Sequence, residues 1–177
     1  MAYAIVGYFD FKTDSFIKSL WKELADNEIC SYLHNSENNP HIKFSMFNQL
    51  DIEKVIPALN DFTRTHNKIT VHLKNYGFFA NETPTLFIDF APSIQLIELE
   101  NDIRNTFNKY GICFDFNYFD ENIWAPSCQL TVKTENSKLN EAIELLLKRP
   151  LQFDGILERI GIIEFHPAKQ IVSCNLI

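Results

Sequence analysis

The sequence predicts an α+β fold, built as a bilobal and pseudo-symmetric duplication of a β-α-β-α-β unit. Segments with apolar residues at helical spacing alternate with segments in which polar and apolar residues alternate, as they do in strands. A phrase of the pattern Pro-polar-apolar-polar-apolar occurs at 40–44 and again at 126–130, and each copy opens a predicted strand after a polar loop. In both copies about ten residues lead to the next helix and about 28 to the following strand, which indicates repeats near 1–80 and 81–177.

The first repeat contains all five elements of the unit. The apolar segment 4–9 is typical of a buried strand, and Thr13 or Asp14 is the expected cap of the helix that follows. The apolar stripe of this helix consists of Phe16, Ile17, Leu20, Trp21 and Leu24. After the first phrase and its strand, Asp51 should cap a second helix with Ile52, Val55, Ile56, Leu59 and Phe62 on one face. A strand at 69–79 completes the repeat.

The second repeat follows the same order. A strand is expected at 86–90, and Ser93 should cap a helix whose apolar residues are Leu96, Leu99, Ile103 and Phe107. After the second phrase comes a helix with an apolar stripe of Leu139, Ala142, Ile143 and Leu146. Strands are expected at 156–165 and 171–177. No Gly/Ser linker separates the repeats, so we predict one bilobal domain over 1–177.

Composition narrows the classes of function. The chain is 46% apolar and carries a net charge of −7, which disfavours binding to long nucleic acids and favours a small ligand. The cysteines form no CxxC pair and no Cys/His cluster has metal-ligand spacing, so we expect free thiols, no metal and no cofactor. Neither a signal peptide nor a membrane span is visible, and we expect a cytoplasmic monomer.

Strand alternation gives each phrase one polar face. His41 and Lys43 share one face of the first strand, and Ser127 and Gln129 share one face of the second. Two such strands facing each other across a pseudo-symmetric cleft would build one site from these four side chains.

At these residues the chain resembles the two-histidine phosphoesterases, the superfamily of 2′-5′ RNA ligase-like proteins and cyclic nucleotide phosphodiesterases. That family carries two H-x-(T/S)-apolar motifs, one in each half of a bilobal α+β domain. Pro40 matches the proline that often precedes the first histidine, and the segment Trp124-Ala125-Pro126 matches the lead-in to the second motif. The resemblance covers nearly the whole chain, and it implies two antiparallel-rich sheets around a central cleft with the helices outside.

The resemblance also implies a division of labour, with one histidine as general base, the other as general acid, and two hydroxyls that hold the phosphate. His41 fits the first histidine position, whereas Ser127 occupies the second. Lys43 and Gln129 stand where the family has Thr or Ser. A serine hydroxyl does not exchange protons near neutral pH, and a positioned acid or base is worth roughly 10²–10⁴-fold in rate. The four side chains still form a set of donors suited to an anionic ligand.

Other residues have two interpretations. His72 lies on one face of the strand at 69–79 together with Thr70 and Lys74, so it could supply the missing acid or base or could simply face solvent. Trp124 could stack on a base, although a core or lid position is the alternative. Tyr8 could reach the cleft mouth or pack in the core. His34 and His66 are expected at the surface, and the acidic run at 115–121 is expected to be a solvated loop rather than a cation site.

Three functions are consistent with these residues. The first is a divergent phosphoesterase or RNA ligase-like enzyme that acts on 2′,3′-cyclic or 2′-5′ phosphodiester ends, with His41 as the surviving acid or base. The second is a non-catalytic protein that binds a small nucleotide or an RNA end through the donor pocket. The third is a structural or partner-binding protein whose cleft has no ligand.

Overall fold

The computed structural model describes residues 2–80, 82–114, 124–132, 134–151, 153–165 and 168–177, so the acidic run at 115–121 lies outside the described residues. The strands are β1 (Ala2–Phe9), β2 (His41–Leu50), β3 (Ile69–Phe79), β4 (Thr85–Phe90), β5 (Gly111–Cys113), β6 (Ser127–Gln129), β7 (Asp154–Phe165) and β8 (Lys169–Asn175). The helices are α1 (Phe11–Asp26), α2 (Tyr32–Asn35), α3 (Ile52–Thr63), α4 (Ile94–Phe107) and α5 (Leu139–Leu147), with 3-10 turns η1 (Asn108–Tyr110) and η3 (Asn136–Lys138). The predicted α+β class is confirmed.

All the strand pairs in the described chain are antiparallel, and they form one connected eight-stranded sheet. The strand order is β5-β2-β1-β7-β3-β4-β6, and β8 pairs with β7 outside this path. The long strand β3 pairs with β7 through residues 69–72 and with β4 through residues 73–79. The two expected sheets therefore share one strand.

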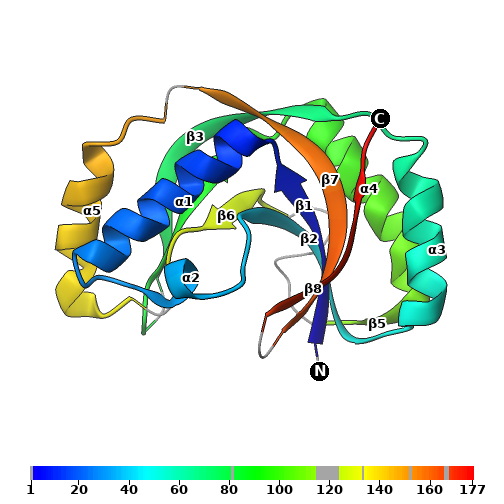
Figure 1. Ribbon diagram of the computed structural model, residues 1–177, viewed down its shortest axis with the longest axis horizontal. Coiled ribbons are helices and arrows are strands. Elements are labelled where there is room, and N and C mark those ends of the chain that lie inside the picture. The colour runs from blue at the N-terminus through cyan, green and yellow to red at the C-terminus, as the bar shows by residue number, and fades with distance from the viewer. Residues whose placement is uncertain (1, 81, 115–123, 133, 152, 166–167) are drawn as a thin grey trace.

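Helices flank the sheet on two sides of the molecule, with α1 and α5 on one side and α3 and α4 on the other (Figure 1). Strand β7 of the second repeat lies between β1 and β3 of the first, and β5 extends the sheet beside β2. Strands from the two sequence repeats are thus interleaved in the sheet. Among the described residues, none of the helices has both the length and the apolar character that a membrane crossing needs.

Two of the expected helix caps are confirmed. The side chain of Asp51 accepts a hydrogen bond from the backbone N–H of Lys54, and that of Ser93 accepts one from the N–H of Leu96. The cap of α1 was predicted wrongly, because the helix begins after Asp10 and Thr13 is buried inside its first turn. Asp10 was not among the expected caps. Its backbone N–H donates to the carbonyl of Ile156 on β7 and its carboxylate accepts from the N–H of Ile156, which ties the start of the helix to that strand.

The other predicted elements are all present, with limits that differ by a few residues. The last strand begins two residues earlier than expected, at Lys169, and ends at Asn175. The short elements α2 and β5 were not predicted. Strand β5 is three residues long, and it exists because it pairs with β2, which is a contact that local periodicity does not report.

The two faces of β1 are buried in different ways. Ile5 and Phe9 belong to the main core, whereas Ala4, Val6 and Tyr8 form a second cluster with Ile163. Because successive side chains of a strand point to opposite faces, this second cluster lies on the other side of the sheet. The polar residues of the first phrase alternate on that same side, since His41 is opposite Tyr8 and Lys43 is opposite Val6.

Candidate functional site

The structure brings the two phrases together. They form the first residues of β2 and β6, and the ammonium group of Lys43 donates a hydrogen bond to the amide oxygen Oε1 of Gln129 over 3.1 Å. These two residues occupy the same position in their phrases although they are 86 residues apart in the sequence. We refer to His41, Lys43, Ser127 and Gln129 as the phrase junction.

His41 is partly buried at the start of β2, and its hydrogen bonding fixes its tautomer. Its Nδ1–H donates to the backbone carbonyl of Asn39 over 2.7 Å, so Nε2 carries the free lone pair. Burial, reinforced by the neighbouring Lys43 cation, lowers the pKa of His41 from 6.5 to about 4, against the opposing effect of the bond to Asn39. The imidazole is therefore neutral at physiological pH and can accept a proton.

Lys43 is held in place from several sides. Burial lowers the pKa of its ammonium group below the usual 10.5. Its Nζ also lies 5.7 Å from the centre of the Phe165 ring, which is the geometry of a cation–π contact. The indole N–H of Trp124 donates to the backbone carbonyl of Lys43 over 2.9 Å, and the Trp124 ring stacks on Phe44 with centroids 5.6 Å apart. Trp124 thus anchors the first phrase from the lead-in of the second.

The second phrase is anchored by Trp21, for which the sequence analysis predicted only a core role. Trp21 of α1 is buried, and its indole N–H donates to the backbone carbonyl of Gln129 over 3.0 Å. A buried indole N–H usually finds an acceptor, but periodicity alone does not say which one. Between the two polar residues, Cys128 points into the core, where burial raises the pKa of its thiol to about 12.

A carboxylate that the sequence did not single out lies beside the serine of the junction. Strand β6 pairs with β4 so that Ser127 is directly opposite Asp89, and Gln129 is opposite Phe87. Directly opposed residues of an antiparallel pair project to the same face with Cβ atoms about 5 Å apart. Asp89 is therefore the titratable side chain that the sheet register places beside Ser127.

On the other side of His41 the sheet places Tyr8 and Arg159. His41 is opposite Tyr8 on β1, and Tyr8 is opposite Arg159 on β7. The rings of His41 and Tyr8 meet edge to face with centroids 6.2 Å apart, and the Arg159 guanidinium lies 5.2 Å from the Tyr8 ring centre. Burial raises the pKa of Tyr8 to about 12, so its hydroxyl stays protonated. This row adds a cation to the donors around His41.

The other histidines that the sequence singled out lie elsewhere. His72 is exposed on β3, and its Nδ1 is 2.7 Å from the carboxylate of Asp154 on β7. His66 stacks on Phe62 with centroids 3.7 Å apart and donates from Nδ1 to that residue's carbonyl. His34 is exposed beside α1. None of the contacts found in the described part of the chain joins these three histidines to the phrase junction.

Comparisons with known proteins give a match at the level of structure. No family model matches the sequence, and no curated protein matches it. Three solved structures share the fold over almost their whole length. TT0787 of Thermus thermophilus matches with a TM-score of 0.66 and 11% identity, over 99% of this chain and 98% of that one. LigT of E. coli complexed with 3′-AMP matches with a TM-score of 0.64 and 14% identity, over 98% of this chain and 97% of that one, and Usb1 of Kluyveromyces marxianus with a TM-score of 0.56 and 11% identity, over 99% of this chain and 97% of that one.

The three structures belong to the two-histidine phosphoesterase superfamily, so the resemblance seen in the phrases is confirmed for the fold. Further crystal structures of E. coli LigT contain NADP⁺, phosphate and ATP.

Proposed function

We propose that this chain, which has the fold of the two-histidine phosphoesterases, binds nucleotide or RNA ends that carry a 2′,3′-cyclic or 2′-5′ phosphodiester and hydrolyses them slowly. The observation that carries the proposal is the hydrogen bond between Lys43 and Gln129. It joins equivalent positions of two phrases that resemble the paired motifs of the family. The ligands of LigT, which include 3′-AMP and phosphate, point to the same chemical class.

The junction can bind a phosphate if a phosphate oxygen replaces the amide oxygen of Gln129 as the acceptor for Lys43. The amide oxygen of Gln129 is a neutral acceptor for the Lys43 ammonium, whereas a phosphate oxygen is charged and binds a partly desolvated cation more strongly. When a phosphate takes over Lys43, the amide of Gln129 can rotate its NH₂ group toward the ligand. The hydroxyl of Ser127 adds a further donor.

The acid–base chemistry has one clear participant and one substitute. Neutral His41 can take a proton through Nε2 from an attacking water. Ser127 cannot protonate a leaving group, and Asp89 is the titratable residue opposite it in the sheet. Without the second histidine, turnover should fall by up to roughly 10²–10⁴-fold relative to a two-histidine site.

A second candidate function is nucleotide or phosphate binding without catalysis. It is favoured by the low pKa of His41, because a base with a pKa of about 4 has little tendency to take up a proton at neutral pH. In this case the donors of the junction would recognise a ligand that leaves unchanged.

The test measures turnover and binding on the same proteins. Hydrolysis of a nucleoside 2′,3′-cyclic phosphate is assayed, and 3′-AMP is titrated calorimetrically, for the parent chain and for His41→Asn, Asp89→Asn and Lys43→Met. The matched control is His72→Asn, which removes a histidine that pairs with Asp154 instead of lying at the junction.

Each function predicts a different result. Slow hydrolysis that is abolished in His41→Asn and preserved in His72→Asn supports the enzyme. Turnover by Asp89→Asn that is lower than that of the parent supports Asp89 as the acid. Binding of 3′-AMP that Lys43→Met weakens, without turnover, supports the non-catalytic protein. If the parent shows neither turnover nor binding at millimolar ligand, both functions are refuted.

A further inference from the structure

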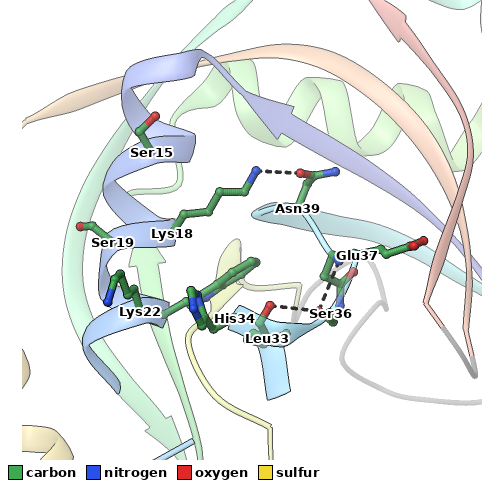
Figure 2. A pocket seen from close by; sticks show the side chains of 11 residues that line it. Ser15, Lys18, Ser19, Lys22, Leu33, His34, Ser36, Glu37 and Asn39 are labelled. Carbon is green, nitrogen blue, oxygen red and sulfur yellow. Dashed lines mark hydrogen bonds between the residues drawn. The ribbon is translucent and has the colours of Figure 1, made fainter. Parts of the chain in front are cut away.

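The lysines of the pocket shown in Figure 2 are already paired. This pocket, about 560 Å³ in volume, lies between α1 and the segment at 33–39. Lys18 is paired with Asp14 at 3.0 Å, and Lys22 is paired with Asp26 at 2.6 Å. An open hydrogen-bonding surface is found instead at an edge of the sheet, along the second half of β3.

The sequence repeat makes β3 the counterpart of β7, and the two strands differ at one edge. Each strand closes its own repeat and pairs with the first strand of the other repeat, since β7 pairs with β1 and β3 with β4. On the edge of β7 that faces away from β1, β8 pairs with residues 159–164. No strand in the described part of the chain covers the corresponding edge of β3, which faces away from β4 at 73–79.

The register of β4 shows which backbone groups of β3 face this open edge. Leu86 of β4 is directly opposite Phe78. The C=O of Leu86 accepts from the N–H of Leu130, and its N–H donates to the hydroxyl of Thr131, both just beyond β6. Opposed residues of an antiparallel pair exchange both hydrogen bonds or none, so the backbone groups of Phe78 point away from β4. Those of Tyr76, two residues earlier, point the same way.

An apolar pocket lies beside this edge. It has a volume of about 200 Å³, and most of its lining comes from β3 and α5, through Tyr76, Gly77, Phe78, Ile143, Leu146 and Leu147. Gly77 has no side chain, so the pocket reaches the backbone of β3. The side chains of Phe78 and Leu147 are exposed to solvent. Exposed apolar side chains beside an open strand edge favour the docking of another strand.

The size of the pocket and the charge of the chain define what can occupy this surface. Sites for small molecules usually have about 300–1,000 Å³, so a pocket of about 200 Å³ suits one large side chain. Backbone donors and acceptors along a strand edge are matched by an extended peptide. Two copies of a chain with a net charge of −7 repel each other, whereas a basic segment is attracted.

We propose that the open edge of β3 binds a basic, extended segment of a partner protein by strand addition. The segment lies antiparallel to β3, in the place that β8 takes on β7. One large apolar side chain of the segment projects on the same face as Phe78 and fills the pocket next to Leu147. Gln129 of the phrase junction projects to the other face, in the row of Phe87 and Gly77, so this inference is independent of the proposed function.

Amide hydrogen exchange in the free protein tests whether the edge is open. The N–H groups of Tyr76 and Phe78 should exchange quickly with solvent, because they point away from β4. The N–H of Gly77, which points toward β4, is the internal control and should be protected. Protection of Tyr76 and Phe78 equal to that of Gly77 would overturn the proposal.

The probe for binding is the blocked synthetic peptide Lys-Thr-Val-Phe-Val-Thr-Lys, which is basic and carries one phenylalanine. In an antiparallel pair, the peptide residues that share the face of Phe78 also turn their N–H groups toward β3. N-methylation of the phenylalanine and both threonines should therefore abolish binding in calorimetry, whereas N-methylation of both valines should leave it unchanged. No binding of the unmethylated peptide at millimolar concentration, or equal binding of the two methylated peptides, would overturn the proposal.

The pocket is tested with Leu147→Gln, and the matched control is Ile94→Gln. The two side chains are 75% and 76% exposed, and Ile94 belongs to α4 on the other side of the molecule (Figure 1). Leu147→Gln should weaken peptide binding about tenfold, as expected when one leucine contact is lost, and Ile94→Gln should not. Equal affinities of the two variants would overturn the proposal. Sedimentation of the parent as a dimer that Leu147→Gln dissociates would assign the edge to a second copy and overturn the basic partner.

Discussion

The environment of His41 makes the stability of the protein depend on pH in a defined direction. Burial lowers its pKa from 6.5 to about 4. Between pH 4 and pH 6.5, His41 is therefore protonated in the unfolded chain and neutral in the folded chain. Stability should therefore rise with pH across this window. At 1.36 kcal/mol for each pKa unit, the contribution of His41 amounts to about 3 kcal/mol, as an upper value because the side chain remains partly exposed.

The perturbation that isolates this contribution is His41→Asn, because an asparagine amide can donate to the Asn39 carbonyl but does not titrate. Urea unfolding is measured between about pH 4 and pH 7 for both proteins, and the imidazole of His41 is titrated by NMR. The difference in unfolding free energy between parent and variant should fall by up to about 3 kcal/mol as the pH is lowered. A constant difference, or an imidazole that titrates near its ordinary value, would refute the burial of His41 and its assignment as a neutral base.

Neighbouring side chains give three more expected outcomes. Because burial lowers the pKa of Lys43, the affinity for 3′-AMP should decline with rising pH at a lower pH than an exposed lysine would give, and calorimetry of Lys43→Met should show no such decline. Trp21→Phe removes the hydrogen bond to Gln129 and should cost about 1–2 kcal/mol of unfolding free energy and weaken 3′-AMP binding; unchanged affinity would contradict a positioning role. Exposed Cys113 should react with iodoacetamide in the folded protein, whereas Cys128, whose pKa is about 12, should react only after unfolding; mass spectrometry that finds early Cys128 labelling would contradict its burial.

Local signals were sufficient for most of the secondary structure. Asp51 and Ser93 were identified as caps because each precedes a clean apolar stripe and no competing residue follows. At α1 the expected caps were Thr13 and Asp14, but the helix begins after Asp10, whose contacts with β7 lie almost the whole chain away in the sequence. The interleaving of strands from the two repeats is likewise a tertiary outcome that no periodicity contains.

The sequence repeat predicted those contacts of the phrase junction that join equivalent positions of the two phrases. Symmetry paired Lys43 with Gln129, and the structure joins them. The repeat could not indicate Asp89, because the residues of the phrase do not show which residue of β4 lies opposite Ser127. It also could not show that Trp21 bonds to the second phrase, since its place in an apolar stripe accounts for its burial equally well.

The strand shared by the two ladders has a consequence for ligand recognition. A protein whose halves are linked only by flexible segments can open about a hinge and close on ligands of different size. Here β3 carries hydrogen-bonded partners along both of its parts, so spreading the halves would break backbone pairing within one continuous strand. The distance between the two phrases is therefore fixed by one continuous sheet. Selectivity must come from how well a ligand fits a site whose width is already set.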